Sequence, residues 1–319
     1  MQRALITGGA GFIGSTLADR LVADGVEVVV YDNLRTGRRD WVPEAANFVE
    51  GDVLDLDALT RATAEVDTVF HLAANADVRH GLDDPRRDLQ QNTIATSNVL
   101  EAMRTQGATR IVFSSTGSVY GEPEVHPTPE DAPFPVQTSL YGASKLAGEA
   151  LISSYCIGYG FTGVVMRFVS ILGERYTHGH VIDFYRALKA DPTRLRVLGD
   201  GKQRKSYLYI GDCVEGVLAA SAATREPGAF EVFNLGTDET TVVDRSVEII
   251  TAHLGVEPEI EKTGGERGWV GDSPFILLDC AKLRRTGWAP TLTIEQAVGR
   301  TLDWFDAHPD IVLEEHAAA

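Results

Sequence analysis

The hydrophobic positions in the first half of the chain follow two alternating patterns. Short runs of apolar and β-branched residues, typical of buried strands, occupy residues 4–7, 26–31, 68–72, 110–114 and 163–168. The segments between them repeat their apolar residues at helical spacing, at residues 13–22, 93–105 and 140–155. Apolar strands that alternate with helices predict an α/β fold with a doubly wound parallel sheet of the Rossmann type.

The pattern changes beyond about residue 170. Gly, Arg and Asp become frequent at residues 173–179 and 198–204, and helical patterns follow at 212–223 and 243–254. We therefore predict two parts. Residues 1–170 form the sheet domain, and residues 171–319 form a smaller α/β lobe.

Composition and charge exclude several classes of function. A formal net charge of -17 disfavours binding to nucleic acid or to an anionic membrane surface. No apolar run is long enough to span a membrane, and the N-terminus lacks the pattern of a signal peptide. The cysteines Cys156, Cys213 and Cys280 are far apart and show neither disulfide nor metal-ligand spacing. We therefore expect a soluble, cytoplasmic protein.

A glycine-rich turn joins the first predicted strand to the first helix. Gly8, Gly11 and Gly14 allow a tight turn and let the backbone approach a pyrophosphate at the helix N-terminus. Asp32 ends the second strand, where a carboxylate accepts hydrogen bonds from the adenosine ribose and repels a 2′-phosphate. The pattern predicts NAD rather than NADP, although three arginines follow at positions 35, 38 and 39.

Candidate chemistry lies at the start of the helix over residues 140–155. Tyr141 and Lys145 are four residues apart and share one helical face. An ammonium beside a phenol lowers the phenol's pKa, and an oxidised nicotinamide adds positive charge, so Tyr141 can act as a general base. Thr116, at the end of a strand, is placed to hydrogen-bond the reacting oxygen. Taken alone, the Tyr–Lys spacing also fits an ordinary surface helix.

Taken in order, these motifs resemble the extended short-chain dehydrogenases/reductases that act on nucleotide sugars. The resemblance covers nearly the whole chain and rests on Asp32 and residues 8–14, 51–53, 71–74, 114–121, 141–145 and 198–201. It implies a tightly held NAD, a nucleoside-diphosphate sugar in the C-terminal lobe, and a catalytic triad of Thr116, Tyr141 and Lys145. The cofactor residues that it implies are Gly8, Gly11, Phe12, Ile13, Gly14, Asp32, Asn33, Asp52, Val53, Leu72, Ala73, Ala74, Asn92, Ser114, Tyr141 and Lys145.

The residues after Thr116 separate the reactions of this family. Sugar 4,6-dehydratases carry an Asp-Glu pair where this chain has Gly117 and Ser118, and UDP-glucuronate decarboxylases carry a Glu at the second position. Galactose-type 4-epimerases have small or hydroxyl residues there. We therefore expect an NAD-dependent 4-epimerase of a nucleoside-diphosphate hexose, with UDP-glucose and UDP-galactose as favoured substrates and a transient 4-keto sugar. The alternatives are a UDP-glucuronate 4-epimerase or decarboxylase, or another enzyme that modifies nucleotide sugars. An inactive NAD-sensing protein is disfavoured by the intact triad.

The expected substrate site departs from the family pattern. Ser170 replaces the usual Asn of an Arg-x-x-Asn motif, as in glucuronate 4-epimerases, and Trp269 replaces an Arg. The substrate-binding candidates are Thr116, Ser118, Ser170, His180, Val181, Arg204, Lys205 and Arg267. His178 and His180 have no third ligand nearby, so we expect no metal.

The helices over residues 93–105 and 140–155 also predict a homodimer. They carry more apolar positions than one sheet-facing stripe requires, namely Ile94, Leu100, Met103, Leu146, Ala150 and Leu151. Related enzymes pair these helices in a four-helix bundle. The alternative is that all six residues face the chain's own sheet.

Overall fold

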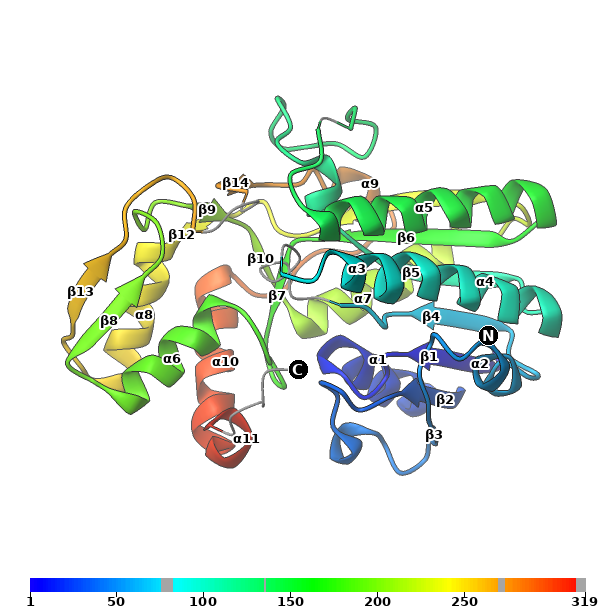
Figure 1. The fold of residues 1–319 in the computed structure, drawn as a ribbon, viewed down its shortest axis with the longest axis horizontal. Coiled ribbons are helices and arrows are strands. Elements are labelled where there is room, and N and C mark those ends of the chain that lie inside the picture. The colour runs from blue at the N-terminus through cyan, green and yellow to red at the C-terminus, as the bar shows by residue number, and fades with distance from the viewer. Residues whose placement is uncertain (76–82, 135, 269–272, 314–319) are drawn as a thin grey trace.

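A seven-stranded parallel sheet lies at the centre of the computed structural model, which describes residues 1–75, 83–134, 136–268 and 273–313 (Figure 1). The strand order is β11-β6-β5-β4-β1-β2-β3, and each neighbouring pair is parallel. The strands are β1 (Arg3–Thr7), β2 (Glu27–Asp32), β3 (Asn47–Glu50), β4 (Thr68–His71), β5 (Arg110–Thr116), β6 (Thr162–Phe168) and β11 (Phe230–Leu235). The predicted doubly wound fold is confirmed.

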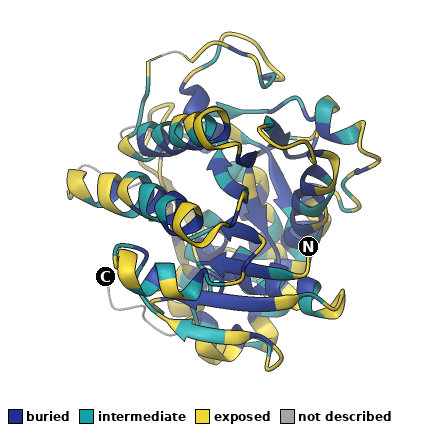
Figure 2. Cartoon of the chain, turned by 90° about the vertical axis from the view of Figure 1, so that its right-hand side faces the viewer, coloured by how far each residue is buried: buried dark blue, intermediate teal, exposed yellow. Residues whose placement is uncertain are grey.

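Helices cover both faces of the sheet because side chains alternate along each strand. Ala4 and Ile6 of β1 belong to a large apolar cluster with α1 (Phe12–Ala23) and α7 (Ile210–Ala223). Leu5 belongs to a second cluster with α2 (Leu56–Ala62), α4 (Ala95–Gln106) and α5 (Leu140–Tyr159). Figure 2 shows the buried strands between helices whose outer sides are exposed.

Two strands of this sheet were not predicted, for different reasons. β3 is an edge strand whose end residues Asn47 and Glu50 are exposed, so its sequence contains no apolar run. β11 pairs with β6 from far along the chain, and its sequence includes Glu231 and Asn234. The division at residue 170 stays a prediction, but the sheet takes one strand from beyond it.

The strand register brings several carboxyl ends to one edge of the sheet. Thr7 at the end of β1 pairs with Tyr31 of β2 and with His71 of β4. Further along the edge, Thr116 of β5 pairs with Phe168 of β6. Ligands of open α/β sheets bind at this edge.

Most of the second half of the chain forms the smaller lobe, on the left of Figure 1. Its longer helices are α6 (His180–Ala190), α8 (Val243–Leu254) and α10 (Ile294–Ala307). β7 (Ser170–Leu172) pairs with β10 (Tyr207–Tyr209), and β8 (Arg194–Val197) pairs with β13 (Glu259–Lys262). β9 (Arg204–Lys205) lies between β12 (Thr241–Val242) and β14 (Phe275–Ile276).

The shorter elements are helices at the margins of these two parts. They are α3 (Pro85–Asp88), which a π-helical segment at Leu89–Ile94 joins to α4, and α9 (Ala281–Arg284) and α11 (Pro309–Leu313). Two 3₁₀ turns lie at Arg39–Trp41 and Gly117–Tyr120. Within the described part of the chain, no helix has the length and apolar character that crossing a membrane requires.

The burial of residues on α4 and α5 contradicts part of the dimer prediction. Leu100 and Met103 are fully buried in the chain's own second cluster, so they are core residues and the prediction for them is wrong. Ile94 is 45% exposed, and Ala150 of α5 is exposed as well. The inward face of α5 carries Lys145 and Glu149, both buried. Part of the apolar surface of this helix therefore lies on its outer face.

Candidate active site

The glycine turn fits closely against the ends of β1 and β4. Gly8 has φ +70°, and a Cβ there would lie 2.6 Å from the backbone nitrogen of Ala73. A Cβ on Gly14 would lie 2.2 Å from the carbonyl oxygen of Gly8. Gly11 is the N-cap of α1 and has no side chain to cap it, so the first-turn N–H groups of Phe12, Ile13 and Gly14 are available to an anion.

Asp32 lies beside this turn at the end of β2. Its Oδ2 accepts a hydrogen bond of 3.0 Å from the backbone N–H of Ala10, and Oδ1 accepts one of 2.8 Å from that of Leu34. Burial raises the pKa of Asp32, although both hydrogen bonds favour the carboxylate. Because each carboxylate oxygen can accept a second hydrogen bond, ribose hydroxyls can still bind there.

Further expected cofactor residues, Asn33, Asp52 and Val53, lie on the neighbouring strand ends. Asn33 Nδ2 donates to Asp52 Oδ2 over 3.1 Å, and Tyr31 Oη donates to the backbone oxygen of Asp52 over 3.0 Å. Val53 is buried beside them. After β4, the N–H of Leu72 donates to the carbonyl of Thr7 over 3.1 Å, which aligns residues 72–74 with the glycine turn. The structure thus brings the predicted cofactor residues of four strands to one edge.

The proposed catalytic triad meets where β5 ends and α5 begins. Ser139 caps α5 by accepting a hydrogen bond from the N–H of Gly142, which fixes the helix start. Lys145 Nζ donates to the carbonyl of Ser114 over 2.7 Å. Thr116 hydrogen-bonds Tyr141 and donates to Ser118 Oγ over 3.2 Å. The structure therefore brings the triad together with Ser114 and Ser118.

The electrostatics of this cluster differ from the expectation that Lys145 lowers the pKa of Tyr141. Burial, with a smaller contribution from Asp88, raises the pKa of Tyr141 to about 12, and only the hydrogen bond with Thr116 opposes them. Burial also lowers the pKa of Lys145 to about 7, against the effect of Glu149 and Asp88. The protein's own groups therefore hold Tyr141 as a neutral phenol.

A buried polar network behind the triad was largely missed from the sequence. Asn92, predicted only as a cofactor residue, donates to Ser144 Oγ of α5 over 2.9 Å and accepts from the N–H of Asn75 over 2.9 Å. Asn75 Nδ2 donates to Asp88 Oδ1 over 2.8 Å. The spacing of Asp88 and Asn92, one helical turn apart, was the available signal for Asp88. Asn75 follows the segment 71–74 but carries no pattern of its own.

His71 is a further buried residue that the resemblance covered without assigning a role. Its Nδ1 lies 2.8 Å from Thr7 Oγ1, and its Nε2 lies 3.1 Å from Thr96 Oγ1. Burial lowers the pKa of His71 to about 3, with a smaller contribution from Lys145. His71 is therefore neutral and joins the ends of β1 and β4 to α4.

Several expected substrate residues gather beside β10. Ser170 is exposed at the start of β7, in register with Tyr207. His180 begins α6, with Nδ1 3.3 Å from Tyr207 Oη and a buried Nε2 that has no hydrogen-bond partner. Burial lowers the pKa of His180 to about 3, and Lys205 contributes to this. Val181 is fully buried in the core, so only its backbone can reach a ligand.

Arg204 and Arg267, the two remaining substrate candidates, lie on other parts of the lobe. Arg204 is exposed on β9, in register with Val242 and Phe275. Arg267 forms an ion pair of 2.5 Å with Glu122, which gives it a carboxylate partner within the chain. Trp269 lies outside the described residues. Among the residues that the structure does describe, no group of three or more His, Cys, Asp or Glu side chains could hold a metal ion.

Comparison with known proteins shows the family to which the chain belongs. The sequence model of the NAD dependent epimerase/dehydratase family matches residues 4–236. UDP-glucose 4-epimerase of Mycolicibacterium smegmatis is 35% identical over 95% of this chain and 98% of its own length. UDP-glucuronic acid decarboxylase 1 of Danio rerio is 30% identical over 95% of this chain and 72% of its own length.

Solved structures agree with the sequence comparisons. A crystal structure of a UDP-galactose 4-epimerase is 39% identical with a TM-score of 0.87, covering 96% of this chain and 99% of that chain. The NAD complex of UDP-glucose 4-epimerase from Thermus thermophilus is 35% identical with a TM-score of 0.85, over the same shares of the two chains. The glycine turn and Asp32 fit this cofactor, which is NAD. The chain belongs to the NAD-dependent epimerase/dehydratase family.

Proposed function

We propose that this protein is a 4-epimerase of a nucleoside-diphosphate hexose, with UDP-glucose and UDP-galactose as the favoured pair. The observation that carries the proposal is the environment of residues 116–118. Ser118 is held by Thr116, and a Cβ on Gly117 would meet Leu278 at 3.5 Å, so an apolar side chain borders this position. Dehydration needs an acid and a base at these two positions, and inversion at C4 needs neither.

In the proposed reaction Tyr141 reacts as a phenolate, and its Oη accepts the proton of the sugar's C4 hydroxyl. Thr116 holds the same oxygen through its hydroxyl, and Lys145 is anchored on the carbonyl of Ser114, one turn of α5 from Tyr141. NAD supplies, when bound, the hydride acceptor for C4 and the positive charge of its oxidised ring. The 4-keto sugar then turns and presents its other face, C4 takes the same hydride back on that face, and Tyr141 returns the proton to the oxygen.

The expected substrate lobe, residues 171–319, contributes the remaining groups. We propose that Arg204, Lys205 and Arg267 bind the diphosphate, and that Ser170, His180 and the backbone at Val181 contact the nucleotide sugar. Arg267 would have to exchange Glu122 for a phosphate oxygen to do so. A UDP-sugar fits best with the substrates named for the relatives.

A UDP-glucuronate 4-epimerase or decarboxylase is the second candidate. Ser170 is small and exposed, its register partner Tyr207 contacts His180, and Lys205 is close enough to affect the pKa of that histidine. Space and positive charge at this point would suit a carboxylate on C6. The similarity to a glucuronate decarboxylase supports the same alternative.

The test is to incubate the purified protein with UDP-, dTDP-, GDP- and CDP-linked hexoses and with UDP-glucuronate, and to follow the products by NMR. We expect inversion at C4 of UDP-glucose and UDP-galactose, with no loss of water or CO₂. Release of CO₂ from UDP-glucuronate would establish the decarboxylase instead. A protein that retains NAD but converts none of these sugars would contradict enzymatic function.

We further propose a homodimer formed by the outer faces of α4 and α5. Ile94 is 45% exposed and Ile157 is 85% exposed, and Ala150 lies exposed between Leu146 and Ile157 along α5. Small residues on this face let two helices approach closely, and a two-fold axis makes such a surface self-complementary. The buried Leu100 takes no part.

Light scattering should therefore give about twice the 34.6 kDa chain mass at micromolar concentration. Ala150→Glu should shift the mass towards the monomer, because two carboxylates would face each other across the axis. Thr60→Ala serves as the control, because Thr60 lies on α2, away from this interface. A wild-type monomer would exclude this interface.

A further inference from the structure

Glu149 is a buried acid on the helix that carries the triad. It lies one turn beyond Lys145 and two turns beyond Tyr141, so the three side chains share one face of α5. Glu149 is 4% exposed and Arg167, on the neighbouring strand β6, is 3% exposed. A buried charge pair needs a specific set of partners to be tolerated, and the partners here lead to the catalytic strand.

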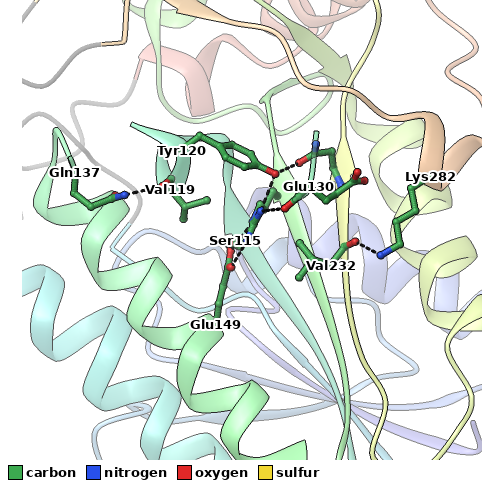
Figure 3. Close-up of polar contacts among 10 residues, drawn as sticks. Ser115, Val119, Tyr120, Glu130, Gln137, Glu149, Val232 and Lys282 are labelled. Atoms are coloured by element: carbon green, nitrogen blue, oxygen red, sulfur yellow. Dashed lines mark hydrogen bonds and ion pairs between the residues drawn. The ribbon is translucent and has the colours of Figure 1, made fainter. Parts of the chain in front are cut away.

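The carboxylate of Glu149 joins α5 to the middle of the catalytic segment. Its Oε1 accepts a 2.5 Å hydrogen bond from Ser115 Oγ, as Figure 3 shows. Ser115 stands between Ser114, whose carbonyl accepts the hydrogen bond from Lys145, and Thr116, which contacts Tyr141. One hydrogen bond therefore fixes the residue between the two that touch the catalytic side chains.

Arg167 completes this arrangement from β6. Its Nε donates to Glu149 Oε1 over 3.0 Å and its Nη2 donates to Oε2 over 2.7 Å, a bidentate pair that fixes the plane of the carboxylate. Its Nη1 donates to Tyr120 Oη over 2.7 Å and to the carbonyl of Glu130 over 3.0 Å. Arg167 thus also holds the turn at Gly117–Tyr120, which begins next to Thr116.

We propose that Glu149 and Arg167 are a positioning pair that sets the register between α5 and β5 at which the triad works. The proposal rests on the proposed function only in that Thr116, Tyr141 and Lys145 carry the reaction. Neither residue of the pair contacts the reacting atoms. A carboxylate held in place by a bidentate guanidinium is a rigid acceptor for Ser115. The pair therefore fixes the distance between β5 and the first turns of α5.

Glu149 also contributes negative charge that raises the pKa of Lys145 against the effect of burial. The charged or titratable groups that affect Lys145 or are affected by it are Glu149 on the same helix, Asp88 at the end of α3, and His71 on β4. His71 is neutral, so Glu149 and Asp88 supply the opposing charge. Removing Glu149 would therefore have two effects. It would reduce the protonated fraction of Lys145 at neutral pH, and it would remove the acceptor of the hydrogen bond from Ser115.

Two variants separate positioning from a purely structural role. Ser115→Ala removes the contact between β5 and Glu149 but leaves the charge pair intact. The double variant Glu149→Met, Arg167→Met replaces the pair with apolar side chains of similar length, a change that often leaves stability unharmed. Ser246→Ala is the control for the first, because Ser246 is equally buried but lies on α8.

Each variant is compared with the wild type in melting temperature, NAD content, kcat and KM. A hydrogen bond to a charged group corresponds to roughly a tenfold to hundredfold effect on rate, so Ser115→Ala should lower kcat by about tenfold with KM little changed. The double variant should lower kcat by about a hundredfold, as expected when catalytic groups lose their alignment. Ser246→Ala should match the wild type.

A folded double variant or a Ser115→Ala protein with kcat within threefold of the wild type (a barrier change of about 0.65 kcal/mol) would overturn the proposal. So would a change in KM alone. The assay uses whichever nucleotide sugar the wild type converts. A wrong epimerase assignment would therefore change the product, whereas a wrong positioning assignment would leave kcat at the wild-type value.

Discussion

Replacing Tyr141 with Phe should reduce kcat by about 10²–10⁴-fold, the usual contribution of a general acid–base group. The substitution removes the phenol oxygen and keeps the ring, so the fold and the NAD content should not change. Turnover of the nucleotide sugar measures kcat, and the absorbance of the bound nicotinamide measures the NAD content. Tyr159→Phe is a matched control, because Tyr159 lies at the far end of the same helix and is 58% exposed. A Tyr141→Phe enzyme with wild-type kcat would remove Tyr141 from the mechanism.

The same tyrosine makes the role of Thr116 testable through pH. The hydrogen bond with Thr116 is the one interaction that lowers the pKa of Tyr141 against burial and Asp88. Thr116→Val removes it, so the pKa rises and the phenolate forms only at higher pH. The ascending limb of the pH–rate profile should therefore move to higher pH, with a smaller loss at the plateau than in Tyr141→Phe.

Gly14→Ala should abolish the retention of NAD during purification. The wild type should release NAD, and not NADP, when it is denatured, because Asp32 occupies the ribose position. In the variant the new methyl group would lie 2.2 Å from the carbonyl oxygen of Gly8 and 2.7 Å from the Cα of Gly9. The backbone of the turn must shift, and the first-turn N–H groups then no longer converge on a pyrophosphate.

Gly299→Ala is the matched control for this substitution. Gly299 also lies within a helix, α10, and a Cβ there would meet nothing within 4 Å. Alanine in a helix interior is favoured over glycine by up to about 1 kcal/mol, so this variant should be slightly more stable and keep its NAD. If Gly14→Ala also kept NAD at wild-type content, the turn would not be the pyrophosphate site.

The sequence predicted those parts of the site whose chemistry depends on short, local patterns. Gly8, Gly11 and Gly14 are needed by the turn itself, and the four-residue spacing of Tyr141 and Lys145 places both on one helix face. Thr116 lies at the end of a predicted strand for an equally local reason. These features survive in any packing of the chain that keeps the strand–helix order.

The features of the site that could not be predicted from the sequence depend on contacts between distant segments. Leu100 reads as one apolar position among several on α4, and only packing against the sheet decides that it is core. The high pKa of Tyr141 follows from the depth of the site and from Asp88, and neither is visible as spacing. The pairing of Glu149 with Arg167 joins a helix to a strand 18 residues further along the chain. Buried ion pairs of this kind have no periodic signature.

The position of β11 has a consequence for how the protein is made. β6 is complete at Phe168, but the strand that covers its free edge ends only at Leu235. During synthesis the ribosome therefore adds more than a third of the smaller lobe while an apolar parallel edge stays open to other chains. All seven residues of β6 are buried once the fold is complete, so the intermediate exposes surface that the native protein never shows. A chaperone that binds extended apolar strands would bind the open edge of β6 at that stage. A fragment ending at residue 170 would keep this edge exposed permanently.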